Sequence, residues 1–232
     1  MASGSSDDNA RIRDQIQFYR EQAGQFPEMG AHDAALQASA YFQVFLEGLG
    51  PDDFIRKYCP PSPRCLELAA GAGRWTGPLL NVCQRITAVD ASPEMHAVNR
   101  ERNGDARVEY VEANIFDYQP TALYELVFAG FWLSHVPQSR FGAFWSMVEQ
   151  ALAPGGRVVM VDDGVRDTDG VARFAEDASG TDANRRLPDG RTFSIVKHAY
   201  APSELEGLLA NLGWTAEVSL LTPVVYVLVA HR

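Results

Sequence analysis

The feature that most constrains the fold is a strand, glycine turn, helix and strand between Cys65 and Asp90. An apolar run carrying one acid, Glu67, leads into the turn Gly71-x-Gly73, and a second apolar run ends at Asp90, 17 residues beyond Gly73. This order is typical of a βαβ unit, which holds a ribose-bearing ligand at the carboxyl ends of its strands. The segment therefore predicts a parallel sheet with a nucleotide-type site at one edge.

The turn departs from the dinucleotide-binding fingerprint at two positions. That fingerprint needs a third glycine three residues after the second, so that helix and strand pack closely, but this chain has Thr76 there. The acid Glu67 would repel a pyrophosphate beside the turn, whereas it would attract a cationic ligand. A cationic nucleotide is therefore favoured over a dinucleotide, and a dehydrogenase is only a third alternative.

The same segment resembles motif I of the class I S-adenosylmethionine-dependent methyltransferases, whose usual form is acid-x-Gly-x-Gly-x-Gly. Gly71 and Gly73 match two of those glycines, and Asp90 matches the ribose-binding acid of that family. Ala69 replaces the first glycine. We expect alanine to be tolerated there because the chain would be extended.

Strands and helices alternate along the chain and predict the fold class. Strands are expected over 64–69, 85–90, 107–112, 123–130, 157–162, 214–220 and 224–230. Helices are expected over 74–83, from the N-cap Ser92, over 138–152, and from Pro202 to Gly213. The turn between the last two strands is so short that they must be antiparallel. The prediction is an α/β fold with a Rossmann-like, seven-stranded, mostly parallel sheet, an antiparallel last strand and helices on both faces.

Length and local composition suggest the domain organisation. Residues 1–9 are small and polar and are expected to be a disordered leader. With 232 residues, the rest suits one sizeable core, so 10–232 is expected to be a single methyltransferase domain. A helical cap over 10–58 would precede the core over 64–232. Residues 163–184 are interpreted as a solvated loop, followed by a hairpin around Pro188-Asp189-Gly190.

Net charge and cysteine content indicate which classes of partner and which cellular location to expect. Thirty acids against twenty Lys and Arg give a net charge of −10, which disfavours nucleic acid and an anionic membrane as partners. The three cysteines lack Cys-x-x-Cys spacing, which is typical of a reduced, cytoplasmic protein. The start has no apolar signal-peptide core, and no run reaches membrane-spanning length. We expect a cytoplasmic monomer or homodimer.

Four further stretches resemble motifs of the methyltransferase family, in the family's order. They are a second motif at 90–95, a region with an adenine-contacting polar residue at 112–117, the end of strand four at 128–137, and the turn before strand five at 152–156. The resemblance extends over residues 15–232. It implies an enzyme that uses S-adenosylmethionine to methylate a small-molecule acceptor by in-line displacement.

The resemblance implies cofactor roles at the first two motifs. The backbone of Gly71 and Gly73 and the following helix N-terminus would face the methionine carboxylate, and Glu67 would face the cationic amino end. Asp90, followed by Ala91, would accept from two ribose hydroxyls. The alternatives are a tight turn for the glycines and a helix-capping acid for Asp90.

Five other residues are implied as cofactor contacts, and four of them have a structural alternative. Met95 would form an apolar wall for the adenine, or simply be core. Asn114 would pair with the adenine amino group, or stabilise a loop turn, while the backbone amide of Ile115 would serve adenine N1. Tyr19 would cover the carboxylate end, or belong to an amphipathic helix packed on the sheet. Phe131 would line the cavity, or pack in the core.

Catalysis is less constrained by the sequence. In-line methyl transfer mainly needs alignment and exclusion of water, and a base only when the nucleophile must lose a proton. His135, after the fourth strand, is the best candidate base because an unperturbed imidazole has a pKa of about 6.5. A structural or substrate-orienting role is the alternative. His198 and Tyr200 are weaker candidates. Asp162-Asp163 invites comparison with a magnesium site, but the family's full ligand set is not evident, so no metal is expected.

Two classes of function remain open. The first is a methyltransferase acting on an oxygen, nitrogen or carbon centre of a small molecule. The second is a protein of the same fold that binds S-adenosylmethionine without methylating, as a sensor, a scaffold or a cyclase or decarboxylase. The chain lacks the Asn/Asp-Pro-Pro-aromatic motif of amino-group DNA methylation. This absence argues against a nucleic acid acceptor.

Overall fold

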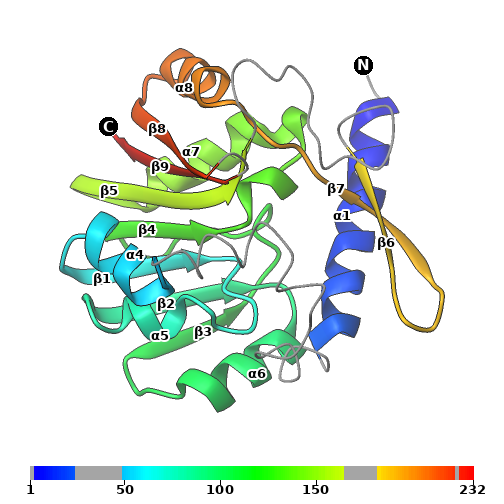
Figure 1. Ribbon diagram of the computed structural model, residues 1–232, viewed down its shortest axis with the longest axis horizontal. Helices are drawn as coiled ribbons and strands as arrows, with labels where there is room; N and C mark the ends of the chain where they lie inside the picture. The colour runs from blue at the N-terminus through cyan, green and yellow to red at the C-terminus, as the bar shows by residue number, and fades with distance from the viewer. Residues whose placement is uncertain (1–2, 24–48, 165–181, 223–224) are drawn as a thin grey trace.

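The computed structural model describes residues 3–23, 49–164, 182–222 and 225–232, and contains a seven-stranded sheet (Figure 1). The strand order is β3-β2-β1-β4-β5-β9-β8. The bounds are β1 Ser62–Leu68, β2 Cys83–Asp90, β3 Val108–Glu112, β4 Tyr124–Gly130, β5 Leu152–Asp163, β8 Thr215–Thr222 and β9 Val225–His231. Neighbours from β3 to β5 are parallel, whereas β9 is antiparallel to both β5 and β8. The predicted fold class is confirmed.

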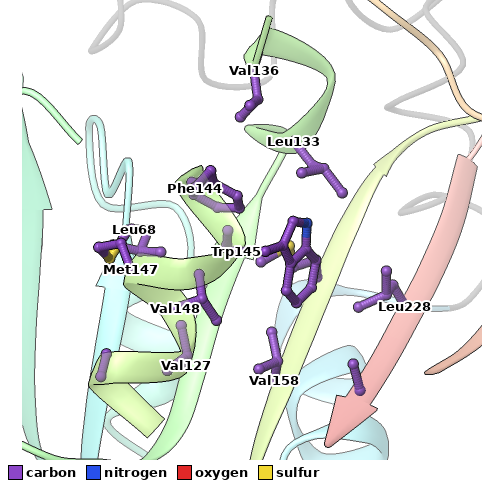
Figure 2. Close-up of a cluster of buried hydrophobic side chains, with 14 of the residues drawn as sticks. Leu68, Val127, Leu133, Val136, Phe144, Trp145, Met147, Val148, Val158 and Leu228 are labelled. Carbon is purple, nitrogen blue, oxygen red and sulfur yellow. The ribbon is translucent and has the colours of Figure 1, made fainter. Parts of the chain in front are cut away.

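Helices cover both faces of the sheet, and each face has its own cluster of buried apolar side chains. On one face, α4 (Pro51–Tyr58) and α5 (Thr76–Leu79) bury Phe54 and Leu79 against the sheet, and α6 (Pro93–Asn103) lies beside α5. On the other face, α7 (Phe141–Ala151) and α8 (Pro202–Asn211) pack over the second cluster. Figure 2 shows Trp145, which has no exposed surface, among Leu133, Val158 and Leu228. The helix predicted over 138–152 is confirmed as α7, although it begins at Phe141 and ends at Ala151.

Local signals explain where several helices begin. Ser92 caps α6 by accepting a hydrogen bond from the Met95 amide (3.1 Å), and Pro93 follows at the first helical position, as predicted. Pro202 likewise stands at the start of α8. In contrast, α5 is shorter than the helix expected over 74–83. Gly77 and Pro78 lie within it, and both residue types are poor helix formers.

The N-terminal helix α1 spans Ser3–Gln22, so the disordered leader expected over 1–9 is wrong for residues 3–9. An ion pair between Asp7 and Arg11 (2.8 Å) supports the early turns. Contacts from a distant part of the chain add to it, because Ser139 donates to Asp8 and Arg140 to Asn9. These tertiary contacts leave no local sequence signal. Residues 24–48 of the helical cap expected over 10–58 lie outside the described residues.

A two-stranded hairpin holds α1 beside the sheet. It consists of β6 (Asp182–Arg186) and β7 (Thr192–Val196), so the predicted hairpin is confirmed, although β6 begins inside the segment expected to be a loop. Phe18 of α1 is buried with Leu187 and Ile195 of the hairpin segment. Figure 1 shows α1 and the hairpin on the side toward which the parallel strands point. No helix among the described residues is long and apolar enough to span a membrane.

Candidate functional site

The turn after β1 has an unusual backbone. Ala69, Gly71 and Gly73 have φ values of 54°, 51° and 78°, all in the left-handed region. The extended conformation expected at Ala69 is therefore wrong. An L-residue in this region costs about 1–2 kcal/mol. The neighbouring Ala70 amide donates to Val89 O (3.0 Å) and ties the turn to β2, which holds the strained residue in place.

The two glycines of the turn serve different purposes. A Cβ added to Gly71 would meet no atom of the described residues closer than Ala69 O at 3.9 Å, so none of those residues fills the space beside this backbone. A Cβ on Gly73 would lie 2.2 Å from Asn99 Oδ1 and 2.3 Å from Asn103 Nδ2. Gly71 thus leaves room for a ligand to approach the backbone, whereas Gly73 makes room for buried side chains of α6.

Asp90 joins the turn to the end of β2. Its Oδ2 accepts from the Gly71 amide (2.8 Å), and its Oδ1 accepts from the Ser92 amide (2.9 Å). Burial raises the pKa of Asp90, while these amides lower it. Each carboxylate oxygen has a second lone pair, so the group can also accept from a pair of hydroxyls. Ser92 provides the side-chain cap of α6, so the helix-capping alternative for Asp90 is not needed.

Glu67 lies buried beneath the turn. Its Oε2 accepts from Thr76 Oγ1 (2.7 Å), whereas its Oε1 has no hydrogen-bond partner among the described residues. Burial raises the pKa of Glu67 to about 8, so the carboxyl is mostly protonated at pH 7. A cationic group bound beside Oε1 would offset the cost of burial, lower this pKa and so favour the carboxylate that attracts it. Thr76, which replaces the third glycine of dinucleotide-binding folds, therefore has its own role as the partner of Glu67.

Two asparagines of α6 complete this buried network and were missed by sequence reasoning. Asn99, which has no exposed surface, donates from Nδ2 to Thr76 Oγ1 (2.9 Å). Asn103 donates to Gly73 O (2.6 Å) and to Asn99 Oδ1 (3.2 Å). The pair is spaced i, i+4, so both residues lie on one helix face. That spacing in the helix after the second strand was the signal available in the sequence.

Tyr19 and His135 meet although 116 residues separate them. His135 Nδ1 lies 2.7 Å from Val196 O, and Nε2 lies 3.2 Å from the Tyr19 hydroxyl. Because a carbonyl oxygen can only accept, we assign the proton to Nδ1, so Nε2 accepts from Tyr19. His135 follows β4 in the short helix η2 (Leu133–His135) and is 5% exposed.

Burial dominates the electrostatics of this pair. It lowers the pKa of His135 well below the usual value, the charge of Lys197 lowers it further, and the Val196 carbonyl opposes the shift. Burial also raises the pKa of Tyr19 to about 12. At neutral pH, the imidazole and the phenol are therefore both uncharged. A neutral imidazole can accept a proton at Nε2.

Arg20, next to Tyr19, attaches α1 to the second motif. Its guanidinium donates to Ala91 O (2.9 Å) and lies 3.8 Å from Glu94 and 3.6 Å from Glu112. Met95 is buried, and packs with Ala72 of the glycine turn and with Ala23 and Tyr19 near the end of α1. The structure therefore brings the first motif, the second motif and α1 together.

The remaining candidates lie at the ends of β3 and β4. Asn114 Oδ1 accepts from the Phe116 amide (3.2 Å) and its Nδ2 donates to Asp117 (2.9 Å), which is the loop-turn arrangement. Ile115 is buried in the core. Phe131 has φ 57° and its amide donates to Val161 O (2.7 Å). Strained residues thus end the adjacent strands β1 and β4, and such strain concentrates at functional sites.

Other polar candidates are engaged elsewhere. The ring of His198 meets that of Tyr200 edge to face, with centroids 4.4 Å apart, and its Nε2 lies 3.5 Å from Glu204 of α8. Asp162 accepts from the Ser134 amide (2.9 Å), and Asp163 pairs with Lys197. Both carboxylates at the end of β5 are therefore occupied by protein donors. In the described ranges, no group of three or more His, Cys, Asp or Glu could hold a metal ion.

Comparisons with known proteins agree with this geometry. Residues 65–156 match the family described as a methyltransferase domain. The chain is 32% identical to DhpI, solved as a complex with SAH, with a TM-score of 0.78 and coverage of 97% of this chain and 98% of DhpI. A DhpI–SAM–HEP complex gives 32% identity, a TM-score of 0.79 and coverage of 96% and 98%.

Two more distant proteins are also similar to this chain. The Burkholderia thailandensis 1,6-didemethyltoxoflavin-N1-methyltransferase is 20% identical, with a TM-score of 0.60 and coverage of 95% of this chain and 88% of that one, a likeness of fold alone. Nodulation protein S of Rhizobium tropici is 27% identical over 103 residues, or 43% of this chain. The match spans 42% of the length of that curated relative.

Proposed function

The chain belongs to the class I S-adenosylmethionine-dependent methyltransferases, and we propose that it methylates a small-molecule acceptor. The observation that carries this proposal is the imidazole of His135, which is buried just after β4 with Nδ1 2.7 Å from Val196 O and Nε2 left to accept a proton. Two relatives support a small acceptor. DhpI was solved with SAM and a second compound, HEP, and the Burkholderia enzyme with 1,6-didemethyltoxoflavin and S-adenosylhomocysteine.

The residues around the glycine turn fit the cofactor. The open space at Gly71 admits a ligand to the backbone, Asp90 has lone pairs for the ribose hydroxyls, and the free oxygen of Glu67 suits the cationic amino end. Further contacts in the proposal come from Tyr19, Ala69, Gly73, Ala91, Met95, Asn114, Ile115 and Phe131. Asn114 would use the second lone pair of its amide oxygen, because the first accepts from Phe116.

When bound, S-adenosylmethionine supplies a methyl group attached to a positively charged sulfur. The sulfur leaves as a neutral thioether, so no acid is needed to assist the leaving group. The protein must therefore align the acceptor with that carbon and exclude water. In the proposal, the acceptor's hydroxyl or amine replaces the Tyr19 hydroxyl at His135 Nε2. As the new bond to the methyl carbon forms, Nε2 takes the acceptor's proton, and Nδ1 keeps its hydrogen bond to Val196.

The test separates cofactor binding from methyl transfer. The purified protein is titrated with S-adenosylmethionine by calorimetry and then incubated with a panel of small metabolites, while S-adenosylhomocysteine is measured. We expect binding, and turnover with one class of acceptor. His135→Gln should retain binding but lose about 100-fold or more in kcat, the usual range for a general base. Tight binding without turnover on any acceptor would instead support a non-methylating protein of this fold.

A further inference from the structure

The segment that carries His135 is clamped by three consecutive residues at the end of the hairpin. Val196 O accepts from His135 Nδ1 (2.7 Å), Lys197 Nζ donates to Ser134 Oγ (2.8 Å), and the His198 amide donates to Ser134 O (2.8 Å). These three bonds link residues that are about 60 positions apart in sequence. The hairpin therefore sets the position and tautomer of the imidazole.

Lys197 is the buried charge within this clamp. It is 3% exposed and forms an ion pair with Asp163 of β5. Next to this pair, Asp162 accepts from the Ser134 amide (2.9 Å). Ser134 is thus fixed at its amide, its carbonyl and its hydroxyl. A buried ion pair is a costly way to stabilise a fold, because apolar residues of similar volume often do as well. The lysine of this pair bonds to Ser134, the residue next to His135, and this contact suggests a role in the reaction.

The titratable and charged groups around His135 come from several elements. Lys197 follows β7, Arg185 belongs to β6, Tyr19 belongs to α1, and the carboxylates of Asp162 and Asp163 end β5. The two cations both lower the pKa of His135, after burial itself. Arg185 pairs with Phe193 in the hairpin register, on the side that packs against α1. Burial and the two cations therefore disfavour a second proton on the imidazole, whereas the two carboxylates act in the opposite direction.

We propose that Lys197 is a positioning residue for methyl transfer, which fixes Ser134 and thereby holds the His135 imidazole uncharged with Nε2 directed at the acceptor. This inference rests on the proposed role of His135 as the base. Lys197 acts through Ser134 and through its charge. An imidazole already protonated at Nε2 could not take the acceptor's proton, so the clamp keeps the base ready before the acceptor binds.

The test uses the full-length protein and the double variant Lys197→Met/Asp163→Asn. Removing only the lysine would leave a buried carboxylate unpaired, which is strongly destabilising, whereas the double variant removes both charges. The pKa of His135 is measured by NMR titration of its ring signals, assigned with His135→Gln. We expect it to rise because the nearby lysine charge is lost, but by less than about one unit because removing the Asp163 carboxylate acts in the opposite direction. Lys197→Arg, which keeps the charge, should leave it near the wild-type value.

Kinetics supply the second readout. The acidic limb of kcat/KM should move to higher pH by the same amount in the double variant. At a pH above both His135 pKa values, kcat should fall about tenfold through lost alignment, while KM for S-adenosylmethionine stays within about twofold. The matched control is Arg186→Met, which removes an exposed cation from the same hairpin and should change neither readout.

The outcomes separate the two proposals. An unchanged His135 pKa in a folded double variant would overturn the role of Lys197, whatever the activity. Equal changes in the Arg186→Met control would also overturn it, because the effect would then not be specific to the clamp. If the NMR shift appears but no acceptor is methylated by the wild type, the clamp is supported as a structural fact and the proposed function fails.

Discussion

Replacing each glycine of the turn after β1 by alanine tests how the cofactor site is built. Both residues have positive φ, so each alanine carries a backbone cost of about 1–2 kcal/mol, partly offset by about 0.4–1 kcal/mol from a less flexible unfolded chain. The variants differ in what the new methyl group meets. At Gly71 the nearest atom of the described residues is 3.9 Å away, whereas at Gly73 two asparagine atoms lie within 2.3 Å.

The expected magnitudes follow from these contacts. In Gly73→Ala, Asn99 and Asn103 must move, which adds about 1–3 kcal/mol of overpacking and about 1 kcal/mol for each hydrogen bond lost to Thr76 Oγ1 or Gly73 O. We expect the free energy of unfolding to fall by about 3–5 kcal/mol in Gly73→Ala and by about 1 kcal/mol or less in Gly71→Ala.

The assay is urea unfolding of both variants, together with calorimetric titration of S-adenosylmethionine. Gly71→Ala should stay folded but lose about tenfold or more in cofactor affinity, because its methyl group would occupy the space where the ligand approaches the backbone. Unfolding free energies within about 0.5 kcal/mol of each other would refute the argument for Gly73. Undiminished cofactor affinity in Gly71→Ala would refute the argument for the open space.

Three further predictions concern buried groups. Because burial raises the folded-state pKa of Glu67 to about 8, the protonated form is favoured in the folded protein, so its contribution to stability should decline as the pH rises from about 4.5 toward 8. Glu67→Gln should remove that dependence in urea unfolding measured across this range, and an unchanged slope would argue that the group is already ionised. For His135, whose pKa lies well below its usual value, kcat/KM should show no acidic limb near pH 6.5, and a limb centred there would place the imidazole in a solvated environment. Trp145→Ala should cost about 3–5 kcal/mol in thermal or urea unfolding because the side chain is fully buried, and a loss below about 1 kcal/mol would contradict its central place in the α7 face of the core.

Strain at the strand ends explains one failed expectation. Ala69 was expected to be extended, since an alanine tolerates that region, but its φ is 54°. The hydrogen bond from Ala70 to Val89 ties the turn to β2, and the chain enters this turn through a left-handed residue. The family's usual glycine at this position avoids the cost. Phe131 ends the neighbouring strand β4 with a similar φ of 57°, so strain recurs at the switch point of the sheet.

The sequence by itself determined the sheet, the glycine turn and the acid at Asp90. Apolar runs that alternate with helical periods, the Ser92-Pro93 helix start and the short last connection depend on hydrogen bonds and packing over a few residues. Such local rules can be read along the chain. They also placed His135 after the fourth strand, and the resemblance to the methyltransferases supplied its candidate role.

Only the tertiary structure decided how these parts act together. It paired Thr76 with Glu67, filled the space behind Gly73 with Asn99, and laid α1 across the strand ends so that Tyr19 meets His135. The clamp from the hairpin onto Ser134 is of the same kind. No local pattern specifies such contacts, because they form between segments 9 to 116 residues apart whose meeting depends on the packing of the whole sheet.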